Sequence, residues 1–126
     1  MSKLVNLFGY ELKNETLDKY LGQLKKQLNA QGLTRVVTLN PEIVAQAENS
    51  VKLKQWLQQA THIVADGHGL QWAAKILLNQ SLTIITGISL VQNILKNNLG
   101  TVYIVGGDPE QIGINVANIK HNYPQA

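Results

Sequence analysis

The stretch HIVADGHG, residues 62–69, decides the fold of this chain. It reads as an apolar strand over 62–65 that ends in Asp66 and a loop with two glycines, after which a helical pattern begins. One α/β unit upstream, the stretch TLNPE, residues 38–42, is a second strand end that carries polar residues. Ligands of open parallel sheets bind beyond the carboxyl ends of the strands. These two loops are therefore where we expect the chemistry.

Outward from this stretch, the periodicity switches repeatedly between strand-like and helix-like, which is typical of a parallel sheet with helices on both faces. The strand-like segments are a short apolar one at 5–8 and those at 36–38, 63–65, 82–85 and 102–105. The helical patterns run from Thr16 to Gly32, from Pro41, from Ser50 through Ala60, over 70–78, from Ser89, and from Pro109 toward Tyr123. The sequence therefore predicts a single Rossmann-like α/β domain over residues 1–126, with a mostly parallel sheet.

Local signals support these helices. Thr16, Ser50 and Ser89 are good N-cap residues, and Asn40 is followed by Pro41, whose fixed φ is already helical. The segment 70–78 is apolar on nearly every side, so we expect it to be buried. Trp56 and Trp72 have apolar helical neighbours, which predicts core positions for both.

Composition bounds the function. Hydrophobic residues make up 44% of the 126 residues and charged residues 15%, which argues against disorder. The net charge of +3 is scattered, so nucleic acid is not an expected partner, whereas a polyanionic small ligand or an acidic membrane surface suits it. The chain has no cysteine, which excludes disulfides and thiolate chemistry. No stretch approaches the roughly 20 apolar residues of a spanning helix, so a cytoplasmic protein is expected.

The residues at the strand ends predict group transfer. Asp66 is our candidate general base, because transfer to an alcohol requires a group that takes the hydroxyl proton. Gly67 and Gly69 would let backbone approach a ligand closely, and His68 lies beside them. Asn40 and the turn at Gly106 and Gly107 precede helices, whose N-terminal amides suit a diphosphate.

Each of these residues also has a purely structural interpretation. Asp66 is a common cap for a following helix, and Asn40 with Pro41 is a routine helix start. Thr38 is an ordinary strand residue, and the turn at 106–109 is as readily a tight turn as a phosphate contact. The third glycine of a dinucleotide fingerprint is absent, so no cofactor is expected. The histidines lack metal-ligand spacing, so no metal is expected either.

Four motifs together carry a resemblance that spans nearly the whole chain: TLNPE at 38–42, ADGHG at 65–69, GISL at 87–90 and YIVGG at 103–107. In this order and spacing they resemble the bacterial WecG/TagA/CpsF glycosyltransferases. The resemblance implies inverting transfer of a sugar such as N-acetylmannosamine from a UDP-sugar to a polyprenyl-diphosphate-linked acceptor, at the inner face of the plasma membrane, in cell-surface polysaccharide or teichoic acid linkage synthesis. It assigns Thr38 and Asp66 to the family's active-site threonine and proposed base.

The chain departs from the family's pattern at two positions and in length. Ile84 stands where the family usually carries an arginine, and Ser89 where it carries an acid. The family's domain also continues further, with a basic C-terminal segment for the membrane surface, so this chain corresponds to its N-terminal portion. We therefore expect exposed strand edges and apolar surface, which favour a homo-oligomer. The alternative to an enzyme is a non-catalytic nucleotide-sugar-binding or assembly module that needs a partner chain.

Overall fold

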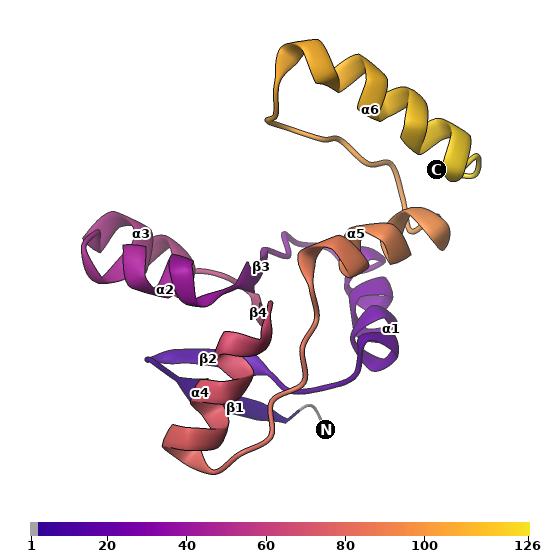
Figure 1. Ribbon diagram of the computed structural model, residues 1–126. Helices are drawn as coiled ribbons and strands as arrows, with labels where there is room; N and C mark the ends of the chain where they lie inside the picture. Colours follow the sequence, from indigo (N-terminus) through magenta and orange to yellow (C-terminus); the bar gives the residue numbers. More distant parts are fainter. Residues whose placement is uncertain (1–2) are drawn as a thin grey trace.

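A computed structural model describes residues 3–126, and its centre is a four-stranded sheet (Figure 1). The strands are β1 (Leu4–Leu7), β2 (Tyr10–Lys13), β3 (Val36–Leu39) and β4 (His62–Ala65), in the spatial order β1-β2-β4-β3. β4 runs parallel to both of its neighbours, and only β1 and β2 are antiparallel. The predicted α/β class with a mostly parallel sheet is confirmed.

The antiparallel pair is a β-hairpin that the sequence did not reveal. Leu7 and Tyr10 face each other across a two-residue turn in which Phe8 has a φ of 54° and Gly9 a φ of 83°. Two positive φ values give the turn geometry that matches the twist of paired strands. Phe8 is a residue that rarely adopts positive φ, which is why the turn has no clear sequence signal.

Side chains alternate across β3 and β4, so the sheet has two packed faces. Val37, Leu39, Ile63 and Ala65 belong to one buried cluster, together with residues of α2 (Pro41–Glu48), α3 (Val51–Gln58) and α4 (His68–Leu78). Val64 lies in a second cluster on the opposite face, with α1 (Leu17–Leu28) and α5 (Gly87–Lys96). Helices therefore cover both faces of the sheet, as predicted.

Most of the predicted helix starts are confirmed. Thr16, Asn40 and Ser50 each accept a hydrogen bond from the backbone N–H three residues later, and Asp108 caps α6 (Pro109–Asn122). Several boundaries were wrong: α3 ends at Gln58 and not at Ala60, and α4 begins at His68 and not at Leu70. α1 ends at Leu28, before the predicted Gly32. Thr86, and not Ser89, is the N-cap of α5, because the Thr86 hydroxyl already accepts the N–H of Ser89 at 3.1 Å.

The predicted strands at 82–85 and 102–105 are only partly present. Residues 82–85 make a single parallel bridge, between Ile84 and Ala65, with the Ile85 N–H donating to the Ala65 carbonyl at 2.8 Å. Residues 102–105 are exposed and form no strand. Their β-branched and aromatic side chains favour a strand, but strand structure also requires a neighbour that supplies hydrogen bonds.

The expectation of a buried α4 was wrong. Leu70 and Ala74 are buried, whereas Trp72, Ile76 and Leu77 are 74%, 68% and 60% exposed. Trp56 is 53% exposed, so neither tryptophan is a core residue. The helix packs on the sheet through one stripe only, and its remaining apolar side chains face outward.

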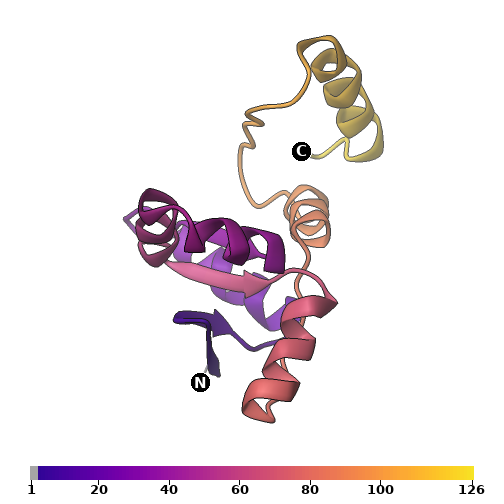
Figure 2. The same ribbon diagram turned by 60° about the vertical axis from the view of Figure 1, so that its left-hand side comes forward.

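The chain consists of two regions that differ in packing. The first, which we call the body, is residues 3–99 and contains both buried clusters. The second, the outlying segment, is residues 100–126, and its helix α6 has no buried residue. Figures 1 and 2 both draw the outlying segment, in orange and yellow, standing away from the sheet.

Among the helices of residues 3–126, none has the length and apolarity that crossing a bilayer would need.

Candidate functional site at the carboxyl ends of the strands

Strand register brings three of the predicted site residues to one face of the sheet. Thr38 pairs with Val64 in the parallel ladder, and the Asp66 N–H continues that ladder by donating to the Leu39 carbonyl at 2.8 Å. Because side chains alternate along a strand, Thr38, Asn40 and Asp66 are directed to the same side, which is the side that α5 covers. All three are partly exposed at the carboxyl ends of β3 and β4.

The N-terminus of α5 completes this group. The Asp66 carboxylate accepts the backbone N–H of Gly87, with 3.1 Å between Oδ2 and the nitrogen. A Cβ atom on Gly87 would lie 3.2 Å from Thr38 Oγ1 and 3.5 Å from Asp66 Oδ2. Thr38, Asp66 and the first turn of α5 therefore form one compact cluster. Asp66 does not cap α4, as its structural interpretation required, because the N-cap is Gly67 and no side chain accepts a backbone N–H at that helix start.

Two further helix N-termini lie at the same edge. α4 begins after Gly67, which has a φ of 94° that other residues rarely adopt. A Cβ on Gly69 would come within 2.5 Å of the Pro41 ring, so the first turns of α2 and α4 are in close contact. The N-termini of α2, α4 and α5 therefore all begin beside the strand ends, and each presents partial positive charge.

Asn40 and His68 lie at this edge, and each uses one of its side-chain polar atoms in a hydrogen bond within the chain. Asn40 Oδ1 accepts the Ile43 N–H at 2.8 Å, which is the predicted cap, and its amide nitrogen is not needed for that bond. His68 is the exposed first residue of α4, and its Nδ1 lies 3.2 Å from Gln71 Oε1. Both side chains remain open to solvent on one side.

Gly106 and Gly107 are not brought to this cluster. They lie in the exposed outlying segment, where a Cβ on either would meet nothing within 4 Å. Both have positive φ, 101° and 90°, which fits the tight-turn interpretation. Their predicted position at a strand end required residues 102–105 to join the sheet.

Sequence reasoning missed Gly87 and Thr86 as parts of the site. A Thr-Gly step after an apolar segment is a usable signal, because threonine is a good N-cap and glycine leaves room beside neighbouring strand ends. Ile84 is partly buried at its bridge to Ala65, and Ser89 donates its hydroxyl to the Thr86 carbonyl at 3.0 Å. Ile84 and Ser89, the two positions at which a departure from the family pattern was expected, therefore both make local structural contacts.

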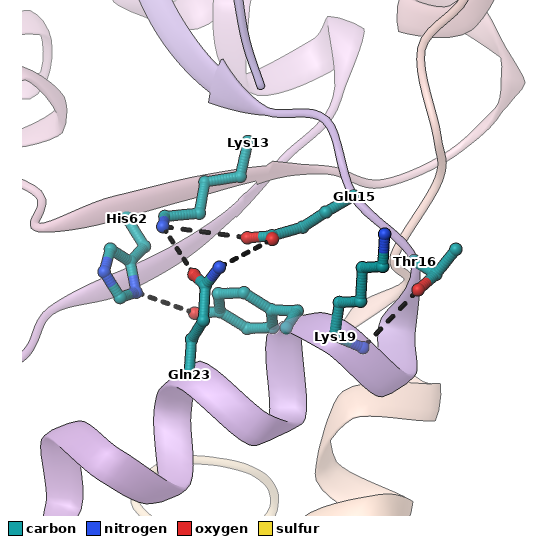
Figure 3. A network of polar contacts seen from close by, with 7 residues as sticks. Lys13, Glu15, Thr16, Lys19, Gln23 and His62 are labelled. Atoms are coloured by element: carbon teal, nitrogen blue, oxygen red, sulfur yellow. Dashed lines mark hydrogen bonds and ion pairs between the residues drawn. The ribbon is translucent and has the colours of Figure 1, made fainter. Parts of the chain in front are cut away.

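A second polar cluster lies at the opposite end of β4 (Figure 3). Lys13 Nζ donates to Gln23 Oε1 at 2.8 Å and lies 3.7 Å from Glu15 Oε1, while Gln23 Nε2 donates to Glu15 Oε2 at 2.7 Å. Nearby, the Tyr20 hydroxyl contacts His62 Nδ1 at 3.1 Å. These contacts tie α1 to β2 and β4.

Electrostatics of this second cluster favour neutral rings. Burial and the positive charge of Lys13 lower the pKa of His62, although the Glu15 carboxylate opposes that shift. Burial raises the pKa of Tyr20, and the charge of Glu15 raises it further. A neutral imidazole beside a protonated phenol is a hydrogen-bonded pair with no net charge, which suits a buried interface between helix and sheet.

Neither cluster has the composition of a metal centre. Within residues 3–126, no group of three or more His, Asp or Glu side chains is close enough to hold a metal ion. An open, mostly apolar cavity of about 510 Å³ lies elsewhere, between residues 98–106 and α6. The polar groups at the strand ends are therefore the best-supported site for chemistry in the described part of the chain.

Comparison with known proteins identifies the class. The chain belongs to the glycosyl transferase WecG/TagA/CpsF family, whose model matches residues 5–126. It is 29% identical over 125 residues to an N-acetylglucosaminyldiphosphoundecaprenol N-acetyl-β-D-mannosaminyltransferase of Staphylococcus aureus strain NCTC 8325, covering 95% of this chain and 49% of that protein. The protein of the same name from strain MRSA252 is 31% identical over 111 residues, covering 84% and 44%. The chain thus spans about half the length of the curated relatives it matches.

Proposed function

We propose that this chain carries the donor side of a glycosyltransferase that moves N-acetylmannosamine, or a similar sugar, from a UDP-sugar to a polyprenyl-diphosphate-linked acceptor. The observation that supports this most is the cluster of Thr38, Asp66 and the α5 N-terminus at the carboxyl ends of β3 and β4. In open α/β sheets this is where ligands bind. The names of the relatives supply the sugar and the acceptor.

Asp66 is the proposed base. Its Oδ2 is held by the Gly87 N–H, and within residues 3–126 its Oδ1 has no hydrogen-bond partner, so that oxygen is available to an acceptor hydroxyl. In the proposed step the hydroxyl gives its proton to Asp66 while its oxygen bonds to the sugar C1. The bond from C1 to the phosphate oxygen breaks, and UDP leaves with the electron pair. Attack opposite to the leaving group inverts C1.

The departing diphosphate gains negative charge, which the protein must stabilise. The N-termini of α2, α4 and α5 present backbone amides beside the strand ends, and amides at helix N-termini stabilise phosphate. Thr38 Oγ1, near Gly87, is placed to contact the sugar or the phosphate. Asn40 offers its amide nitrogen, while Gly67 is the N-cap of α4 and His68 and Gly69 are in its first turn. No metal is needed in this scheme.

The membrane side of the reaction is part of the same proposal. A polyprenyl acceptor stays in the bilayer, so the chain would act at the inner membrane face as a peripheral protein. The family resemblance implies that a basic segment makes this contact.

The test uses the purified chain and two variants. Calorimetric titration with UDP-N-acetylmannosamine should give saturable binding to the wild type, and Thr38→Val should weaken it because the hydroxyl is removed at nearly constant shape. With an N-acetylglucosaminyl-diphosphoprenol acceptor present, UDP release by Asp66→Asn should fall about 10²- to 10⁴-fold while donor binding persists. Asp18→Asn, at the exposed start of α1, is the matched control and should change neither quantity.

Two outcomes would redirect the proposal. Turnover by Asp66→Asn equal to that of the wild type would remove Asp66 as the base. Donor binding without turnover by the wild type would favour the alternative, a nucleotide-sugar-binding module that needs a partner chain, for which the half-length match to the relatives is the supporting observation.

A further inference from the structure

The outlying segment contains a stretch of strand-forming sequence, residues 102–105, that pairs with nothing in the described chain. Within residues 3–126, the backbone groups of 101–107 make no hydrogen bond, and Tyr103, Ile104 and Val105 are 87%, 58% and 95% exposed. This sequence is rich in β-branched and aromatic residues, which favour pairing with another strand. An exposed apolar strand with free N–H and C=O groups is a template for association.

The body contains a matching strand edge. Residues 82–85 are joined to β4 on one side through the bridge at Ile84, and within the described chain the N–H of Ile84 has no acceptor. Leu82 and Ile85 are buried, whereas Thr83 and Ile84 are partly exposed. The Leu82 carbonyl accepts Gln71 Nε2 at 3.0 Å, and the Thr83 N–H donates to Asn14 Oδ1 at 2.8 Å, so the Ile84 N–H is the group of this edge that pairing would satisfy. The two strands lie on either side of α5, which is the order of a right-handed β-α-β unit.

The turn after α5 directs the outlying segment away from its own edge. Asn98 has a φ of 47° and Gly100 a φ of 150°, and residues 100–108 then run outward to α6 (Figures 1 and 2). α6 keeps exposed apolar side chains at Ile112, Ile114 and Val116, with the cavity of about 510 Å³ beside it. Residues 102–105 and α6 thus have a complementary edge in the body, at residues 82–85, with which they do not pair in this conformation.

We propose that two copies of this chain exchange these segments, so that residues 102–105 of one copy pair in parallel with residues 82–85 of the other. The favoured occupant is a second copy because the chain carries both the free edge and the free strand, and because exchange of an identical element is a low-cost route to a dimer. Pairing supplies an acceptor for the Ile84 N–H and partners for the backbone groups of residues 102–105, and α6 follows onto the partner body.

Exchange also completes the site, and this step rests on the proposed function. A strand that is parallel to 82–85 and beside it ends at the same edge as β4. Gly106 and Gly107 follow that strand, so the partner copy would bring its glycine turn next to Asp66 and Gly87. The separation of these glycines from the cluster in the single chain is thereby explained.

The absence of cysteine makes a mixing experiment clean. Thr83→Cys is made in a tagged copy and Tyr103→Cys in an untagged copy, and the two are mixed, unfolded, refolded and treated with a short bis-maleimide. Exchange predicts a covalent product of the tagged with the untagged chain, and light scattering of the wild type should give twice 13.9 kDa. Val51→Cys, 75% exposed on α3, replaces Thr83→Cys as the control and should give no such product.

A second variant separates pairing from folding. Ile104→Pro removes a ladder N–H and should abolish the dimer while the circular dichroism of the body stays unchanged. The proposal would be overturned if the wild type is monomeric. It would also be overturned if a double Thr83→Cys/Tyr103→Cys variant cross-links only within one chain, or if Ile104→Pro leaves the dimer intact. None of these readouts depends on glycosyl transfer, so failure here is distinguishable from failure of the proposed function.

Discussion

The body and the outlying segment have equally good local signals but very different packing. α2 in the body and α6 in the outlying segment both begin with an Asn or Asp cap followed by proline. α2 buries Val44 and Ala47 against the sheet, while α6 buries nothing. Local capping defines where a helix starts, but most helix stability in proteins comes from packing an apolar face. The difference teaches that the outlying segment needs a surface that its own body does not supply.

The largest effect should come from matched core truncations. Leu39→Ala, at a side chain with 0% exposure, should lower the free energy of unfolding by about 2–5 kcal/mol. Ile104→Ala in the outlying segment should change it by less than about 0.5 kcal/mol when measured by urea titration at a concentration where the chain is monomeric. Equal losses in the two variants would contradict the division into two regions.

Glycine substitutions should have opposite signs in the two regions. Gly69→Ala places a Cβ within 2.5 Å of the Pro41 ring, which should destabilise the body by about 1–3 kcal/mol. Gly113→Ala lies within α6 with nothing within 4 Å of the new atom, so it should favour that helix by about 0.5–1 kcal/mol. Thermal unfolding followed by circular dichroism measures both, and stabilisation by Gly69→Ala would show that α2 and α4 do not meet.

Tyrosine hydroxyls provide a smaller version of the same comparison. Tyr20→Phe leaves His62 Nδ1 buried without its contact and should cost about 1–3 kcal/mol. Tyr103→Phe, at an 87% exposed side chain, should be nearly neutral. Urea midpoints of the two variants check this, and a neutral Tyr20→Phe would mean that the pair contributes nothing to holding α1.

The smallest expected effect is a pH dependence of the body. The pKa of His62 in the folded chain lies below its ordinary value of 6.5. As the pH is lowered, His62 is therefore protonated in the unfolded chain before it is protonated in the folded chain. The stability that comes from the neutral, buried His62 is fully present above about pH 6.5 and is lost as the pH falls through the pKa of the folded chain. The urea midpoint should decrease as the pH is lowered from 7.5 to 5.5, and His62→Gln should make that decrease smaller. An unchanged slope in the variant would assign the dependence to other groups.

Much of the body was predictable because its signals are local. The caps Thr16, Asn40 and Ser50 and the alternation in β3 and β4 follow directly from the residues. The errors concern non-local packing: residues 102–105 have strand propensity but no partner, and the apolar surface of α4 has nothing to cover it. Propensity describes what a segment can adopt, whereas burial depends on what lies beside it.

The candidate site divides in the same way. Thr38 and Asp66 were predictable, because polar residues at the ends of neighbouring parallel strands must share an edge. Their contact with Gly87 was not, since it depends on how α5 returns to the sheet after residues 82–85. Gly106 and Gly107 were expected at the edge on the assumption that 102–105 forms a strand in the same chain.

The most direct measurement is an NMR amide titration of the isotope-labelled chain with UDP-N-acetylmannosamine, compared with UDP and with ATP. We predict dispersed spectra and saturable shifts at Thr38, Asn40, Asp66 and Gly87 for the two UDP compounds, with Gly106 and Gly107 responding only at concentrations where the chain is dimeric. Collapsed spectra, or shifts that ATP reproduces and that avoid the strand ends, would contradict the account of a folded body that holds a donor site at its carboxyl edge.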